Sequence, residues 1–171
     1  MDKALISSAT GKLELLNIVL HEAKLLRNKN EDPLAYPADL RQQFMTVIRS
    51  EELTFETPNK SDKQLNLFRV YVEFGARAIR EPAAKKSAKR KSSLKIYYTV
   101  EATFRVDYLV KDKLTKSEAE AFSNFNAVHN VWPFWREHVL HSLRAAELPL
   151  LNVPLMRGMA IGKKQLGHQP A

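Results

Sequence analysis

The sequence contains no cysteine, which excludes disulfide bonds, catalytic thiols and zinc sites built from cysteine. Glycine is scarce too, with five residues in 171, so there is little material for a glycine-rich phosphate-binding loop. No apolar run is long enough to cross a membrane, and residues 1–6 lack the apolar core of a secretory signal. We therefore expect a cytoplasmic protein with no membrane insertion, no metal and no cofactor.

The histidines form no catalytic motif either. His138 and His141 are three residues apart and Glu137 stands beside them, but neither the His-Glu-x-x-His nor the His-x-x-Glu-His order occurs. The serine and aspartate residues show no nucleophile signature. The sequence therefore predicts a protein that is not an enzyme.

What is present fits one soluble globular domain. The composition is 44% hydrophobic and 27% charged, and a chain of this length can bury most of its apolar residues in one core. We divide the chain into an N-terminal tail (1–11), a folded domain (12–155) and a flexible C-terminal tail (156–171), because the last segment has no periodicity.

Alternation of apolar and polar residues predicts β-strands. The pattern is clearest over residues 94–110 and recurs over 68–78, so these segments predict a long antiparallel hairpin. A weaker alternation over 45–55, interrupted by Glu51 and Glu52, predicts another strand with a bulge. This predicted strand ends at a turn signal.

Residues 12–27 are ambiguous. Leu13, Leu16 and Leu20 recur at helical spacing, and the content of Leu, Glu, Ala and Lys favours a helix as well. Periodicity alone would therefore predict a helix here.

The C-terminal third predicts helices. Thr115 and Glu118 form a capping-box pattern, which opens one helix. Pro133 suits the first turn of a second helix, because its missing N–H would be unpaired there in any case. Apolar residues follow at helical spacing, and we expect them in the core or at an oligomer interface. This set is Trp132, Phe134, Trp135, Val139 and Leu143.

The segment NAVHNVWPFWREHVL (126–140), followed by LPLLNVPL (148–155), resembles the helix and exit segment of SecB-type export chaperones. The shared pattern is aromatic-Pro-aromatic-x-Arg-Glu and, later, Leu-Pro-x-Leu. The resemblance implies an α+β fold in which a four-stranded antiparallel sheet packs against C-terminal helices. Because four strands are reached only if residues 12–27 form one, we assign that segment to a strand.

The resemblance also implies function and assembly. SecB-type chaperones bind non-native polypeptides without ATP, as homotetramers in which dimers joined through sheet edges pair through their helices. Client-binding residues would then lie on the connection and second strand, at Leu34, Tyr36, Phe44 and Val47. Divergent members include chaperones of toxin-antitoxin-chaperone systems, which hold an aggregation-prone antitoxin, so both export and antitoxin stabilisation stay open.

A second local match gives another register. LTFETPN (53–59) looks like the end of the first strand of conventional export members, and residues 1–40 would then be an N-terminal extension. Glu52 and Glu56 would fall at the acidic positions with which those members dock the translocation motor SecA. We prefer the register that supplies all four strands.

A nucleic-acid-binding protein is the alternative reading. The chain carries a formal charge of +8, and residues 80–91 contain six cations and one anion. Such a loop can neutralise phosphates, but it contains no aromatic residue on which a base could stack. Charge runs of this kind are more often solvated hairpin tips, so we expect nucleic acid not to be a main partner.

Overall fold

The computed structural model describes residues 2–32, 35–37, 39–56, 64–80 and 94–156. Its strands are β1 (Leu13–Arg27), β2 (Arg41–Glu56), β3 (Gln64–Arg80) and β4 (Lys95–Val110). Its helices are α1 (Lys3–Lys12), α2 (Lys116–Phe122), the π-helical turn η2 (Ser123–Ala127) and α3 (Val128–Ala145).

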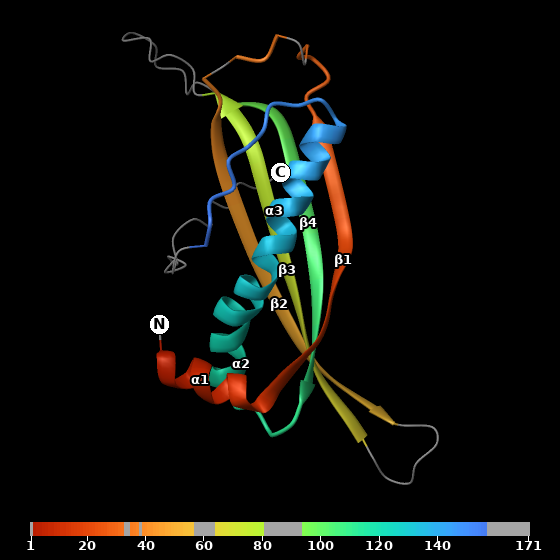
Figure 1. The fold of residues 1–171 in the computed structure, drawn as a ribbon, viewed down its shortest axis with the longest axis vertical. Helices are drawn as coiled ribbons and strands as arrows, with labels where there is room; N and C mark the ends of the chain where they lie inside the picture. The colour runs from red at the N-terminus through yellow and green to blue at the C-terminus, as the bar shows by residue number, and fades with distance from the viewer. Residues whose placement is uncertain (1, 33–34, 38, 57–63, 81–93, 157–171) are drawn as a thin grey trace.

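The four strands form one antiparallel sheet in the order β1-β4-β3-β2. β3 and β4 lie in the centre, whereas β1 and β2 are the edges. Helices α2 and α3 cross one face of this sheet, and α1 packs beside α2 at one end (Figure 1). The predicted α+β fold, with four strands backed by C-terminal helices, is confirmed.

Irregular pairing of strand β1 explains why its sequence has the spacing of a helix. Its pairing with β4 shifts register twice, between Leu15 and Asn17 and between Leu20 and Glu22. Each shift adds a residue and reverses the alternation of faces, so the regular spacing of two is lost. The assignment of residues 12–27 to a strand is confirmed.

The other strand pairs follow the sequence pattern closely. β2 pairs with β3 from Arg41↔Ile79 to Glu56↔Gln64 without a register shift, so the bulge expected in β2 is wrong. The predicted hairpin is β3 with β4, which has one shift between Ala78 and Ile79. Most of the basic run, residues 81–93, lies outside the described residues.

Helix α2 begins as predicted. The Glu118 backbone N–H donates to Thr115 Oγ1 at 3.2 Å, and the Thr115 N–H donates to Glu118 Oε2 at 2.7 Å, which completes the capping box.

We expected the second helix to begin near Pro133, and this expectation is wrong. The backbone stays in the right-handed helical region from α2 through η2 into α3, so Pro133 lies inside α3. The helix started at Thr115 therefore continues past the proline, at the expense of one backbone hydrogen bond.

The predicted apolar stripe faces the sheet. Phe74 of β3 stacks on Trp135 and meets Trp132 edge to face, both at a ring-centroid distance of 5.4 Å. Val139 and Leu143 are fully buried beside them. Phe134 differs, because 45% of its surface is exposed. Four of the five helix residues therefore form the core.

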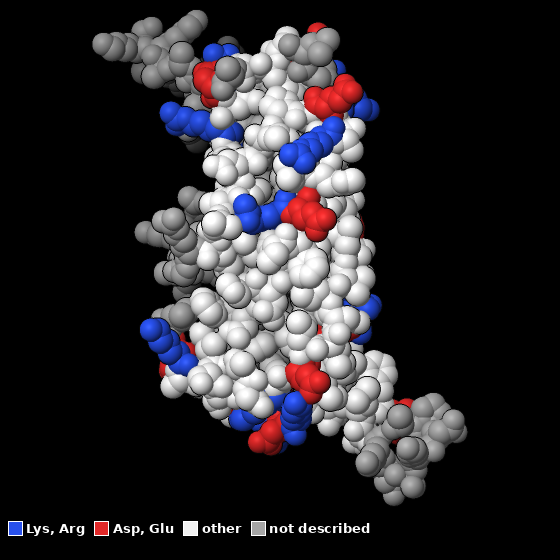
Figure 2. Space-filling model, in the orientation of Figure 1, with Lys and Arg blue, Asp and Glu red and all other residues white. Residues whose placement is uncertain are grey.

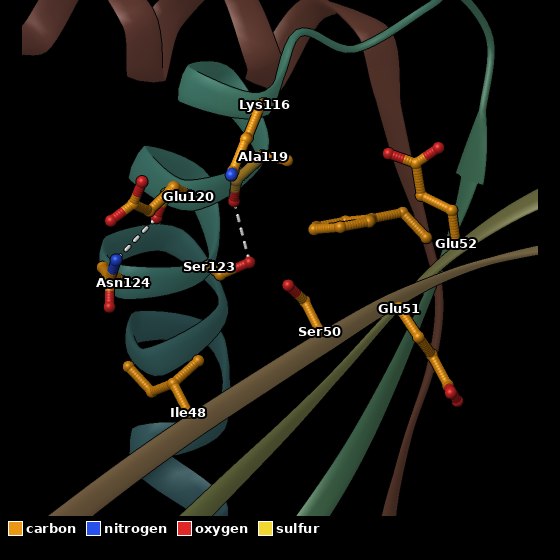
Figure 3. A pocket seen from close by; sticks show the side chains of 10 residues that line it. Ile48, Ser50, Glu51, Glu52, Lys116, Ala119, Glu120, Ser123 and Asn124 are labelled. Atoms are coloured by element: carbon orange, nitrogen blue, oxygen red, sulfur yellow. Dashed lines mark hydrogen bonds between the residues drawn. The ribbon is translucent and has the colours of Figure 1, made fainter.

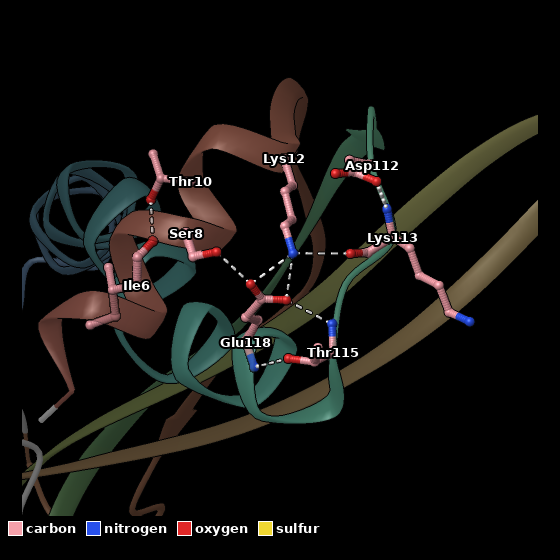
Figure 4. Close-up of polar contacts among 8 residues, drawn as sticks. All are labelled: Ile6, Ser8, Thr10, Lys12, Asp112, Lys113, Thr115 and Glu118. Atoms are coloured by element: carbon pink, nitrogen blue, oxygen red, sulfur yellow. Dashed lines mark hydrogen bonds and ion pairs between the residues drawn. The ribbon is translucent and has the colours of Figure 1, made fainter.

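Residues 3–12 form helix α1, although the sequence suggested a tail. The Asp2 side chain caps it, and Ala9 is its one buried residue, so there was no apolar stripe to reveal it. Glu118 holds the helix in place by accepting from Lys12 Nζ at 2.8 Å and Ser8 Oγ at 2.5 Å (Figure 4). At the other end, residues 157–171 of the expected C-terminal tail lie outside the described residues.

No helix in the described part of the chain combines the length and the apolar character that a membrane span requires.

Candidate polypeptide-binding face

The segment after α3 runs back along the helix-covered face beside β2 (Figure 1). We call residues 146–156 the exit segment. Five side chains donate to its backbone carbonyls. Arg27 and Tyr98 reach Ala146 O and Pro149 O near its start. Further along, Gln42 Nε2 reaches Asn152 O at 2.9 Å, Arg136 Nε reaches Val153 O at 3.0 Å, and Trp132 Nε1 reaches Pro154 O at 2.9 Å. Leu148 and Val153 are buried beneath it, whereas Leu150 and Leu155 stay exposed. The exit segment therefore lies as a hydrogen-bonded polypeptide between α3 and the start of β2, and we call the place that it occupies the groove.

Both edge strands carry exposed apolar side chains. The set on β1 is Leu15, Leu16, Val19, Leu20 and Leu26, and the set on β2 is Phe44, Met45, Val47 and Phe55. Within the described residues, the outer backbone edge of each strand has no β-strand partner. An edge strand with free N–H and C=O groups and apolar side chains is a template for pairing with another chain.

Charge is sparse on the helix-covered face. Figure 2 shows it with few Lys, Arg, Asp or Glu side chains, which occur singly or in small groups. A surface of this kind repels an apolar polypeptide segment less than a densely charged one would.

The structure separates the four predicted client-binding residues. Leu34 lies outside the described residues. Tyr36 packs on the core, 5.3 Å from the Tyr97 ring centroid and stacked over Tyr98, and burial raises the pKa of its hydroxyl. Tyr36 is thus anchored in the fold.

Phe44 and Val47 lie on opposite faces of the sheet. Phe44 pairs with Ala76, on the side of Phe74 and the helices, whereas Val47 pairs with Glu73, on the uncovered side. The side chains of Phe44 and Val47 are 39% and 37% exposed. They therefore cannot line a groove on one face, and only Phe44 lies on the side of the exit segment.

A hollow of about 690 Å³ opens between β2 and helices α2 and η2 (Figure 3). Ile48, Phe68 and Ala119 supply its apolar surface, and Ser50, Ser123 and Asn124 supply polar groups. The charged residues around it are Glu51, Glu52, Glu120 and Lys116. The hollow is therefore partly apolar and carries more carboxylates than cations.

The two glutamates of the alternative register lie on the helix side of β2. Glu52 pairs with Phe68 and Glu56 with Gln64, whose side chains share the face of the helices. Glu52 borders the hollow, whereas Glu51 points away from the helices (Figure 3). The position of Glu52 suits contact with whatever occupies the hollow.

The uncovered face of the sheet carries charges that pair with one another. Asp107, buried to 4% exposure, accepts from Arg69 Nε at 2.6 Å and lies 3.3 Å from Arg105 Nε. Hydrogen bonding to Asp107 raises the pKa of Arg69. Arg49 lies over the Tyr71 ring at 5.6 Å. Asp107, Arg69 and Arg105 thus form a local ion-pair cluster on this face.

The histidine cluster is part of the helix packing. His138 stacks on Trp135 and meets Phe104 edge to face, and burial lowers its pKa, with a smaller effect from His141. In the described ranges, no group of three His, Asp or Glu residues could hold a metal ion.

Sequence reasoning missed most of the exposed apolar residues. Met45 and Phe55 were read as ordinary strand positions, and the leucines of β1 were noted only for their helical spacing. Their exposure follows from strand order, because β1 and β2 are both edges. The signal available was the shorter and less apolar pattern of β2, which is typical of an edge strand.

Comparison with known proteins agrees with the fold. No protein-family model matches the sequence, and no curated protein matches it. A SecB-like chaperone of Mycobacterium tuberculosis, solved in complex with a ChAD peptide from the HigA1 antitoxin, is similar in structure. The TM-score is 0.57 at 14% sequence identity, with 91% of this chain and 98% of that chain covered. The chain therefore has the fold of SecB-like chaperones, as its aromatic helix and exit segment indicated.

Proposed function

We propose that this protein is an ATP-independent chaperone that holds non-native polypeptides on the helix-covered side of strand β2. The observation that supports this most directly is the combination found there. Phe44 is exposed on an edge strand whose outer side pairs with no other strand among the described residues, and the extended exit segment lies on the same face of the sheet. An unfolded chain offers the matching groups, which are apolar side chains and unpaired backbone amides.

The exit segment indicates how a client could bind. Gln42, Arg136 and Trp132 all donate to main-chain carbonyls, so they recognise an extended backbone without reading its side chains. Recognition of this kind tolerates many sequences. Leu150 and Leu155 add apolar surface beside the groove.

We propose an aggregation-prone antitoxin as the client class, rather than exported proteins in general. The structurally similar chaperone was solved with an antitoxin peptide, and this supports the proposal. Docking of an export motor would need an acidic surface, whereas the acids of the uncovered face are balanced by arginines such as Arg69 and Arg105. We also propose assembly into a homotetramer.

The test uses the purified full chain and a chemically unfolded client. We expect the protein to suppress aggregation of the client at a near-stoichiometric ratio of the two, as measured by light scattering. The suppression should be equal with and without ATP. Absence of suppression at a large excess of the protein would refute the holdase. Suppression that depends on ATP would refute the mechanism.

A further inference from the structure

The exit segment has a direction. Its carbonyls meet Arg136 at Val153 and then Trp132 at Pro154, so the chain advances toward the N-terminal end of α3. Asn152 of this segment lies beside Gln42, the second residue of β2. Met156 is the last described residue and packs against the core.

The hollow lies directly ahead on this path. Its β2 wall begins at Ile48, further along the strand than Gln42, and its helix wall runs from Asn124 back to Lys116, before Trp132 in the chain. From Trp132 to Glu120 the helix rises about 18 Å at 1.5 Å per residue. An extended chain covers this distance in about six residues beyond Pro154. Residues 157–164 therefore have the length to span the hollow.

The chemistry of those residues matches the hollow. Residues 157–171 contain Arg157, Lys163 and Lys164 and no Asp or Glu, with Met159 and Ile161 between the cations. The hollow offers carboxylates around an apolar floor, of which Ile48 and Ala119 are partly exposed.

Two carboxylates of the hollow have no partner of their own. Across the part of the chain that the structure describes, neither Glu52 nor Glu120 forms an ion pair, although the whole chain is strongly basic. Both side chains are exposed, so a cation brought to either one gains the modest attraction of a surface ion pair.

We propose that the hollow between β2 and helices α2 and η2 is a docking site for the chain's own C-terminal segment, residues 157–164. Arg157 and the two lysines pair with Glu52 and Glu120, and Met159 and Ile161 cover the floor at Ile48 and Ala119. The segment continues the course of the exit segment toward α2. One consequence rests on the holdase proposed above: the docked segment competes with clients that enter from this end.

Because the chain has no cysteine, an engineered pair can report docking without competing thiols. Ser50→Cys places a thiol on the exposed wall of the hollow, and Ala160→Cys places the second about six residues beyond Pro154. The matched control is Val47→Cys with Ala160→Cys, since Val47 lies on the same strand but on the opposite face. Under mild oxidation, we expect the Ser50 pair to form an intrachain disulfide at least tenfold faster than the control.

A charge exchange tests the chemistry in the same full-length chain. Adding Glu52→Lys and Glu120→Lys to the Ser50 pair should slow the disulfide severalfold, and adding Arg157→Glu, Lys163→Glu and Lys164→Glu as well should restore the rate. Circular dichroism melting checks that each variant folds, and non-reducing electrophoresis separates intrachain from interchain bonds. Equal rates for the Ser50 and Val47 pairs, failure of the charge exchange to restore the rate, or bonds only between chains would overturn the proposal. The readout does not involve a client, so a loss of holdase activity would refute the proposed function and leave docking standing.

Discussion

Trp132 of helix α3 donates its indole N–H to the carbonyl oxygen of Pro154 at 2.9 Å, across the groove beside β2. The same residue meets Phe74 of the sheet edge to face. One side chain therefore joins the sheet, the helix and the exit segment.

Replacing Trp132 by Phe tests this link. The ring still packs on Phe74 but cannot donate to Pro154, so we expect a loss of about 1 kcal/mol in the free energy of unfolding, measured in urea. Thermolysin should cleave near Leu150 several times faster than in the parent chain. Phe134→Leu, on the exposed side of the same helix, is the control and should change neither quantity. Unchanged cleavage in the Trp132 variant would show that the hydrogen bond does not hold the exit segment.

Glu118 gives the fold a dependence on pH. Hydrogen bonds from Lys12, then Ser8 and Thr115, lower its pKa from 4.5 to about 2. The carboxylate therefore stabilises the folded state above about pH 4.5, and this contribution is lost as the pH falls toward 2. We expect Glu118→Gln to lower the melting temperature at pH 7, and the two curves to converge as the pH approaches 2.

The control for Glu118 is a carboxylate at the start of strand β1. Glu14 pairs with Lys111 at 2.7 Å, but both side chains are more than half exposed. Exposed pairs contribute little, so Glu14→Gln should barely move the melting temperature at any pH. If both variants behave alike, Glu118 does not hold α1 against α2 through its charge.

The central strands and the capped helix could be predicted because local pattern decided them. Phe68, Val70 and Val72 alternate in the sequence just as they alternate on β3, since a central strand with one face under helices needs that spacing. Thr115 likewise carries its own signal, because a capping box is a contact between residues three apart.

The edges and the site could not be predicted in this way. The bulges of β1 reversed its alternation, and only strand order determines that Leu20 is exposed. Phe44 and Val47 were grouped from the resemblance, although three residues along a regular strand always change face. The hollow joins β2 to α2 and η2, which are far apart in sequence, and no local pattern reports such a site.

Strand β1 should carry the interface between copies. Val19 and Leu26 lie on the uncovered face of this edge strand, opposite Arg105 and Thr99 of β4, and are exposed. We expect the parent chain to form tetramers by light scattering after gel filtration. Val19→Lys with Leu26→Lys should break the tetramer into smaller species, because lysines on an edge strand oppose pairing with a second strand. The same change at Val47 and Phe55, on the other edge, should leave the assembly intact. A parent chain that is monomeric at every concentration would exclude the tetramer.

Variants on the two faces of β2 test whether the client binds at the groove or at any exposed apolar side chain. Phe44 and Val47 differ little in exposure, but only Phe44 faces the groove of the exit segment. Burial of a phenylalanine contributes about 1.5–3 kcal/mol, so we expect Phe44→Ser to weaken client affinity roughly tenfold or more. Val47→Ser should leave affinity within about twofold, because its side chain lies across the sheet from the client. Fluorescence anisotropy of a labelled unfolded peptide measures both, and light scattering confirms that each variant keeps the parent assembly. Equal losses in the two variants would mean that exposed apolar area, and not the groove, binds the client; a loss confined to Val47→Ser would move the site to the uncovered face.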